Sequence, residues 1–155
     1  MSMCKEEGDD RIDEDRSALK EAKEGRIPNA SLLKARLLFD GGYLDRALEI
    51  LSNVDIMILN QDEILEHAYR KGRIYQEKGH VDQALINFSF CVNKGQDSDA
   101  YYRCGSALQL GNLYEQNGQN HLAREYFNKC LKINPSEYKN SLHQKAKAGL
   151  NRTKE

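Results

Sequence analysis

The chain has 155 residues, 30% of them charged, and a formal net charge of −1 at pH 7. A near-neutral chain of this length is one domain in size, and it creates no overall field that would attract nucleic acid or a membrane surface. No apolar run approaches the ~20 residues of a membrane span and no signal-peptide core is present, so we expect a soluble, cytoplasmic protein.

The N-terminal part of the chain is polar and acidic. Residues 1–11 lack hydrophobic periodicity, and we therefore predict a disordered tail. Residues 12–25 predict a helix, with Leu19 and Ala22 on its thin apolar face and Gly25 at its end. We interpret this helix as one half of a preceding repeat.

Three helix pairs are predicted next, at about residues 29–53, 60–93 and 98–135. Asn29 is expected to cap the first helix of the first pair, because its side-chain oxygen can accept from a free backbone N–H. The apolar residues 54–59 join the first two pairs. Since they have no second strand to pair with, we predict an extended connection tucked over the core.

Helix ends are indicated by local signals. Asn60 and Glu63, three residues apart, predict a capping box at the start of the second pair. Gly118 is expected to end a helix in the left-handed conformation that glycine adopts without steric cost. Ser136 is predicted to cap a last helix at residues 136–151, whose polar face would seal the open end of a stack.

A set of small and aromatic residues recurs at matching offsets in consecutive pairs. The second pair has Gly72, Tyr75, Gly79, Ala84, Phe88 and Cys91, and the third has Gly111, Tyr114, Gly118, Ala123, Phe127 and Cys130. A fainter copy in the first pair has Ala35, Leu38, Gly42, Ala47 and Leu51. The glycine of the first helix predicts a close approach between paired helices, because no side chain separates them there.

This order of small residue, aromatic, turn glycine, alanine, aromatic and small residue resembles the tetratricopeptide repeat. The stretch YKNSLHQKAKAGLNR is also similar to the ending of a group of bacterial tetratricopeptide proteins of undefined function. The resemblance implies an all-α fold: an α-α superhelix, or solenoid, of about three helix pairs with an N-terminal helix and a C-terminal capping helix.

The resemblance also implies a non-enzymatic scaffold, whose first helices line a concave groove for a peptide or a partner protein. The candidate groove residues are Arg36, Tyr69, Arg70, Arg73, Gln109 and Asn112. Arginine binds carboxylates bidentately, so an acidic or carboxylate-ended peptide is the ligand hypothesis. In the alternative interpretation, Arg70 and Arg73 pair with glutamates four residues away on their own helix, Glu66 and Glu77.

No motif of an enzyme, a cofactor site or a metal site is present. The glycines lie at helix ends and helix contacts, not in a nucleotide-binding loop, and there is no HExxH or CxxC pair. The four cysteines have no paired spacing. Cys91 and Cys130 share one repeat position, and Cys104 lies on a predicted core face. We interpret these three cysteines as small buried hydrophobic residues.

Two other functions remain as alternatives. The chain could be the structural C-terminal repeat segment of a larger bacterial protein and pack on its own upstream repeats, which the half repeat at residues 12–25 favours. Residues 129–155, with seven basic and two acidic residues, could contact nucleic acid. No aromatic residue lies between the five bases from Lys139 to Lys154, which disfavours nucleic acid as the partner.

Overall fold

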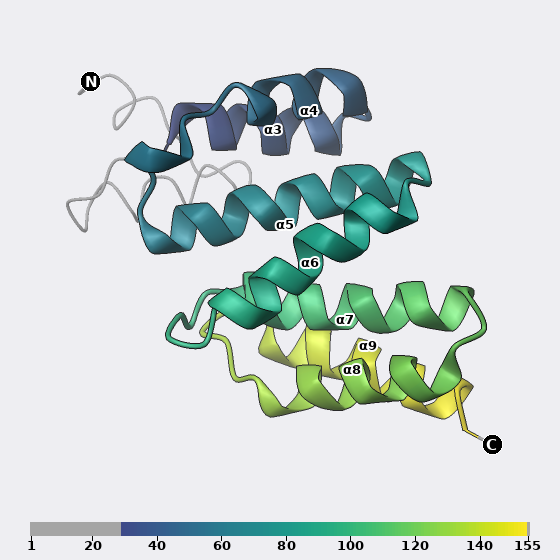
Figure 1. The fold of residues 1–155 in the computed structure, drawn as a ribbon. Coiled ribbons are helices and arrows are strands. Elements are labelled where there is room, and N and C mark those ends of the chain that lie inside the picture. Colours follow the sequence, from purple (N-terminus) through teal and green to yellow (C-terminus); the bar gives the residue numbers. More distant parts are fainter. Residues whose placement is uncertain (1–28, 155) are drawn as a thin grey trace.

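The computed structural model describes residues 29–154, so the predicted tail at residues 1–11 and the predicted helix at residues 12–25 lie outside it. The described residues form helices and no strand (Figure 1). The helices are α3 (Ala30–Asp40), α4 (Leu44–Ser52), a short 3-10 turn η1 (Ile56–Ile58), α5 (Gln61–Lys78), α6 (Val81–Lys94), α7 (Tyr101–Gln116), α8 (Asn120–Lys132) and α9 (Lys139–Arg152).

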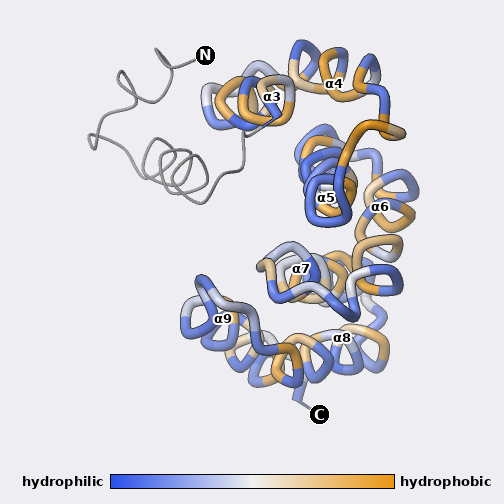
Figure 2. The backbone as a smooth tube through the Cα atoms, turned by 90° about the vertical axis from the view of Figure 1, so that its left-hand side faces the viewer, coloured by the Kyte–Doolittle hydropathy of each residue, from blue (hydrophilic) through white to orange (hydrophobic). Residues whose placement is uncertain are grey.

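The helices are arranged in two curved layers (Figure 2). Helices α3, α5, α7 and α9 form the inner layer, and α4, α6 and α8 form the outer one. Each inner helix packs on the next one, α3 on α5, α5 on α7 and α7 on α9. This stacking of helix pairs confirms the predicted all-α superhelix. None of the helices in residues 29–154 combines the length and the hydrophobicity that a bilayer span requires.

The three helix pairs turn at equivalent glycines. Gly42, Gly79 and Gly118 have φ angles of 86°, 80° and 78°, in the left-handed region that glycine adopts most easily. The prediction for Gly118 is confirmed. Helix starts also follow the sequence: Asn60 Oδ1 accepts from the Glu63 backbone N–H at 2.8 Å, and Glu63 Oε1 accepts from the Asn60 N–H at 3.0 Å.

The closest helix contacts place a phenylalanine ring against a glycine. A Cβ atom built on Gly72 would lie 2.7 Å from the Phe88 ring, and one on Gly111 would lie 2.5 Å from the Phe127 ring. Phe127 is also pressed against α9, where a Cβ on Gly149 would lie 2.4 Å from its Cζ. Both phenylalanines are fully buried. These glycines therefore make room for an aromatic ring that fills the core.

The prediction for residues 54–59 is wrong. The side chain of Asp55 accepts from the Met57 backbone N–H at 3.0 Å and closes the turn η1, which directs the apolar side chains outward. Met57 is 87% exposed and Ile58 is 72% exposed, whereas Leu59 is buried. The connection thus packs on the core only through its ends.

The predicted cap of the last helix is also wrong. Ser136 donates its backbone N–H to Asp99 O at 2.8 Å instead of capping a helix, and α9 begins three residues later, at Lys139. The residue before α9, Tyr138, has a φ of 63° and is 53% exposed. The inner face of α9 is made by Ala146 and Gly149, both of which are buried.

Candidate binding groove

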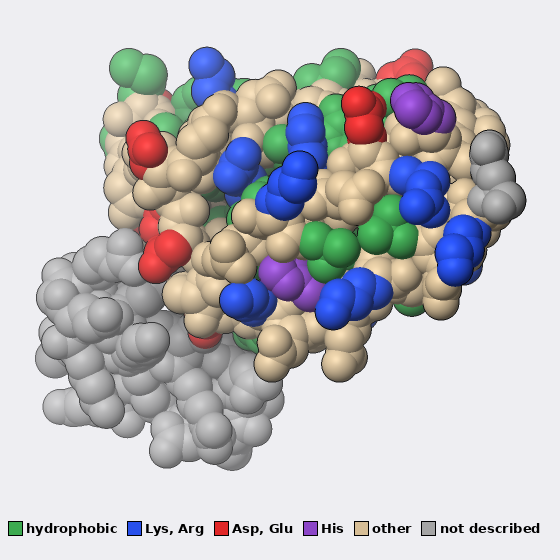
Figure 3. All heavy atoms as spheres, turned by 90° about the horizontal axis from the view of Figure 1, so that it is seen from below, with side chains coloured by type: hydrophobic (Ala, Val, Ile, Leu, Met, Phe, Trp, Pro, Cys, Tyr) green, Lys and Arg blue, Asp and Glu red, His purple; other side chains and the backbone are tan. Residues whose placement is uncertain are grey.

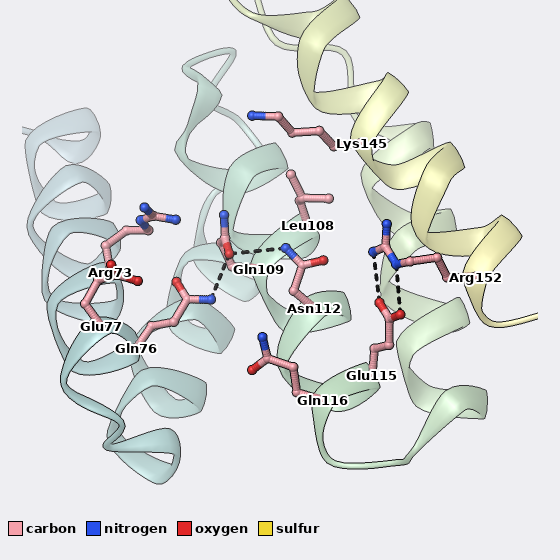
Figure 4. A pocket seen from close by; sticks show the side chains of 10 residues that line it. All are labelled: Arg73, Gln76, Glu77, Leu108, Gln109, Asn112, Glu115, Gln116, Lys145 and Arg152. Carbon is pink, nitrogen blue, oxygen red and sulfur yellow. Dashed lines mark hydrogen bonds and ion pairs between the residues drawn. The ribbon is translucent and has the colours of Figure 1, made fainter.

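A groove of about 570 Å³ lies between three helices of the inner layer (Figure 4). Helices α5, α7 and α9 supply its walls, so the groove exists only because the last helix folds back beside α7. The lining residues are Arg73, Gln76 and Glu77 of α5, Leu108, Gln109, Asn112, Glu115 and Gln116 of α7, and Lys145 and Arg152 of α9. Nearly all of these side chains are polar, which suits hydrogen bonding more than burial of a large apolar ligand.

Three amide side chains connect α5 to α7 along the groove. Gln76 Nε2 donates to Gln109 Oε1 at 2.8 Å, and Asn112 Nδ2 donates to the same oxygen at 3.4 Å. Gln76 Oε1 is buried and has no hydrogen-bond partner among the described residues. A buried acceptor without a partner is costly, so this oxygen favours a ligand that brings a donor.

An ion pair connects α7 to α9 at one end of the groove. The Arg152 guanidinium donates to both carboxylate oxygens of Glu115, at 2.9 Å in each case (Figure 4). This bond lowers the pKa of Glu115 and raises that of Arg152. Both groups satisfy each other, and their bidentate geometry fixes the position of α9 against the groove.

Two cations of the groove have no carboxylate partner among the described residues. The Arg73 guanidinium lies over the Phe39 ring, 5.4 Å from its centroid, and does not form the predicted ion pair with Glu77. Lys145 of α9 is exposed at the groove. A guanidinium stacked on an aromatic ring keeps its edge N–H groups available for an anionic group of a ligand.

Tyr69 and Arg70 belong to the core and not to the open groove. They are 9% and 8% exposed. Arg70 Nε donates to Glu66 Oε2 at 3.2 Å, and Arg70 Nη2 donates to the Tyr101 hydroxyl at 2.9 Å. The guanidinium also lies over the rings of Tyr69 and Tyr102. The alternative interpretation of Arg70, a partner for Glu66, is the one that the structure shows.

The six candidate residues therefore lie in three different places. Arg73, Gln109 and Asn112 line the groove together, whereas Tyr69 and Arg70 lie in the neighbouring aromatic cluster. Arg36 projects from α3, is half-buried, and its Nε atom has no hydrogen-bond partner among the described residues. Ligand binding by any of the six stays a prediction.

Sequence reasoning missed the contribution of α9 to the groove, because that helix was interpreted only as a cap. Lys145 and Arg152 are seven residues apart, two helical turns, and therefore lie on one face. This spacing of seven residues was the signal that could have identified the groove face of α9. Gln76, three residues after Arg73, was missed because each helix was interpreted separately.

The C-terminal end of the molecule is rich in basic side chains. Figure 3 shows this face, where Lys and Arg side chains outnumber acidic ones among the described residues. On α9 the exposed bases include Lys139, Lys145 and Lys147. The basic surface thus continues from the groove across the last helix. Within residues 29–154, no three His, Cys, Asp or Glu side chains lie together as a metal site would require.

Comparison with known proteins agrees with the architecture. Residues 99–137 match the family described as "Tetratricopeptide repeat". This confirms the predicted resemblance and supports protein partners. A curated relative is "Photosystem I assembly protein Ycf3" of Acaryochloris marina (strain MBIC 11017), 24% identical over 97 residues. The match covers 61% of this chain and 57% of the relative, so it spans little more than half of that protein. No solved structure matches the chain significantly.

Proposed function

We propose that this tetratricopeptide repeat chain is a non-enzymatic protein-interaction module that binds a peptide or partner segment in the groove between α5, α7 and α9. The observation that carries the proposal is the bridge from Gln76 to Gln109. It leaves a buried acceptor, Gln76 Oε1, without a partner among the described residues, and Arg73 lines the same groove without a carboxylate partner among those residues. An extended peptide offers backbone N–H donors for Gln76 Oε1 and carboxylates for the Arg73 guanidinium.

The ligand proposed for this groove is an acidic or carboxylate-ended segment. Arg73 and Lys145 supply the positive charge of the groove. Gln109 and Asn112 supply amide donors and acceptors for a peptide backbone. Arg36, Tyr69 and Arg70 act in this proposal as the adjoining wall and not as primary contacts. The relative is an assembly protein, which supports a function in bringing other proteins together.

A peptide-selection experiment tests the proposal. Random peptides displayed on phage are selected against the full chain, and the affinities of the enriched sequences are measured by calorimetry. We expect enrichment of Asp, Glu or a free C-terminal carboxylate. Arg73→Glu is expected to weaken binding by about 10- to 100-fold, since a charged hydrogen bond contributes about 1.5–3 kcal/mol.

The chain offers a matched control for this variant. Arg46 of the outer-layer helix α4 is exposed and stacks over the Tyr43 ring at 5.6 Å, much as Arg73 stacks over Phe39. Arg46→Glu makes the same change of charge away from the groove and should leave the affinity unchanged. Equal affinities of the two variants for the selected peptides would contradict groove binding.

The second candidate function is a structural repeat segment that packs on repeats of a larger bacterial protein. One observation favours it: Leu37 of α3, the first described helix, is 45% exposed. If the chain is such a segment, a fusion with the upstream repeats would bury Leu37 and raise the melting temperature. Leu37→Glu would then cancel the rise in melting temperature without affecting peptide binding.

A further inference from the structure

Two buried cysteines lie side by side in the third helix pair. Cys104 belongs to α7 and Cys130 to α8, and their Sγ atoms are 3.5 Å apart. Neither side chain is exposed. The residues are 26 positions apart in the sequence, so the packing of α7 on α8 brings them together.

The two sulfur atoms lie where α7, α8 and α9 meet. Cys104 Sγ lies 3.5 Å from Cys130 O, and Cys130 Sγ lies 3.8 Å from Leu142 O of α9. The sulfur–sulfur hydrogen bond lowers the pKa of Cys104 and raises that of Cys130. Because the thiolate is the nucleophilic form, this asymmetry makes Cys104 the more reactive of the two.

The second helix pair shows that the repeat does not itself require a sulfur pair. Cys91 occupies the same repeat position as Cys130 and is equally buried, but its Sγ donates to the backbone oxygen of Leu65 at 3.1 Å. Leu65 precedes Gly72 by seven residues, just as Cys104 precedes Gly111. Burial raises the pKa of Cys91 to about 11. In the third pair, Cys130 thus has a cysteine, Cys104, at the position where Cys91 of the second pair has Leu65.

We propose that Cys104 and Cys130 form a site of reversible oxidation, an intramolecular disulfide that links α7 to α8. The oxidant is a peroxide. The Cys104 sulfur attacks one oxygen of hydrogen peroxide, the O–O bond breaks, and a sulfenic acid and one water form. The Cys130 sulfur then attacks the Cys104 sulfur, the S–O bond breaks, and the hydroxyl leaves as a second water with the Cys130 proton. Two thiols lose two electrons, and the peroxide gains them.

The disulfide has a structural consequence. The sulfur atoms must approach from 3.5 Å to about 2.05 Å. The disulfide therefore joins two helices that already pack on each other. The link closes a loop that contains most of α7 and α8, and it restricts the unfolded chain. Oxidation should therefore raise the melting temperature by several degrees. This inference is independent of the proposed groove function, because it requires no partner.

The experiment uses the full chain with Cys4→Ser, which leaves three of its four cysteines. The native protein is treated with hydrogen peroxide, denatured and alkylated, and its remaining thiols are counted by mass spectrometry. We expect one thiol to remain, on Cys91, and a peptide map that joins Cys104 to Cys130. Dithiothreitol should restore all three thiols and return the melting temperature to its original value.

Three variants complete the test. Cys91→Ser removes a cysteine that is equally buried and should leave the link intact, whereas Cys104→Ser and Cys130→Ser should each abolish it. The peptide map of the parent and of Cys91→Ser decides the result even if the other two variants fold poorly. Three unreacted thiols, oxidation to sulfinic acid without a link, or a link that includes Cys91 or a second molecule would overturn the proposal.

Discussion

Replacing Gly111 with alanine should destabilise the third helix pair. The added Cβ would lie 2.5 Å from Cδ1 and Cε1 of Phe127, about 1 Å inside the 3.5–4.0 Å at which two carbon atoms pack well. Phe127 cannot move away, because its other side is pressed against Gly149 of α9. Overpacking of a core costs about 1–3 kcal/mol, and the better helix propensity of alanine returns up to about 1 kcal/mol.

A 2.5 Å contact belongs at the upper end of this overpacking range, about 2–3 kcal/mol, so the net loss for Gly111→Ala is about 1–2 kcal/mol. This loss corresponds to a fall of about 2–8 °C in the melting temperature for a chain of this size. Gly105→Ala is the matched control on the same helix. Its Cβ would lie 3.1 Å from Cε1 of Tyr69, a milder contact, and we expect a change within about 0.5 kcal/mol. Thermal melts followed by circular dichroism measure both. A Gly111→Ala variant as stable as the parent would refute this packing argument.

Three further predictions concern helix ends and the last helix. Asn60→Ala should lower the unfolding free energy in urea by about 0.5–2 kcal/mol, since it removes the cap of α5. The ion pair with Arg152 depresses the pKa of Glu115, so its contribution to stability is present above about pH 4.3 and is lost as pH falls through the lowered value. Glu115→Gln should thus be slightly less stable than the parent at pH 7 but equal to it at pH 2. Truncation after Pro135 removes α9 and uncovers the Phe127 ring, so light scattering and dye binding should show aggregation. A truncated chain that stays monomeric and well folded would argue against a sealing function of α9.

The features that sequence reasoning predicted well depend on local chemistry. Gly118 adopts the left-handed conformation because a single residue decides the turn, and Asn60 with Glu63 caps α5 because three residues decide a capping box. The small residue at Gly111 was correctly linked to a close approach of helices. Its partner is the Phe127 ring, which fills the space that the missing side chain of Gly111 leaves.

The features that it missed depend on neighbours far along the chain. Arg70 was a candidate for an open groove, but the hydroxyl of Tyr101, 31 residues away, and the carboxylate of Glu66 both bind it. Ser136 was a candidate cap, but Asp99, 37 residues away, accepts its N–H and delays the start of α9. Helical periodicity identifies the buried face of a helix, and it does not identify which distant group meets a polar side chain on that face.

The binding groove is the clearest example of this limit. Arg73, Gln109 and Asn112 were identified because they lie on predicted faces of their own helices. Gln76 and Lys145 were not, because their proximity to the other three requires α5, α7 and α9 to stack in this order. The apolar residues 56–58 show the opposite error: hydrophobicity suggested burial, but a turn fixed by Asp55 exposes them.

Binding of a peptide between α5, α7 and α9 can be observed through the side-chain amide signals of glutamine and asparagine in that groove. A selected acidic peptide is titrated into the ¹⁵N-labelled full chain, and the NH₂ resonances are followed by NMR. If the peptide binds in the groove, the signals of Gln76, Gln109 and Asn112 should shift together and saturate with the dissociation constant found by calorimetry. Saturable binding that shifts only the signals of residues in the outer helices α4, α6 and α8, such as Asn87, would contradict binding in the groove.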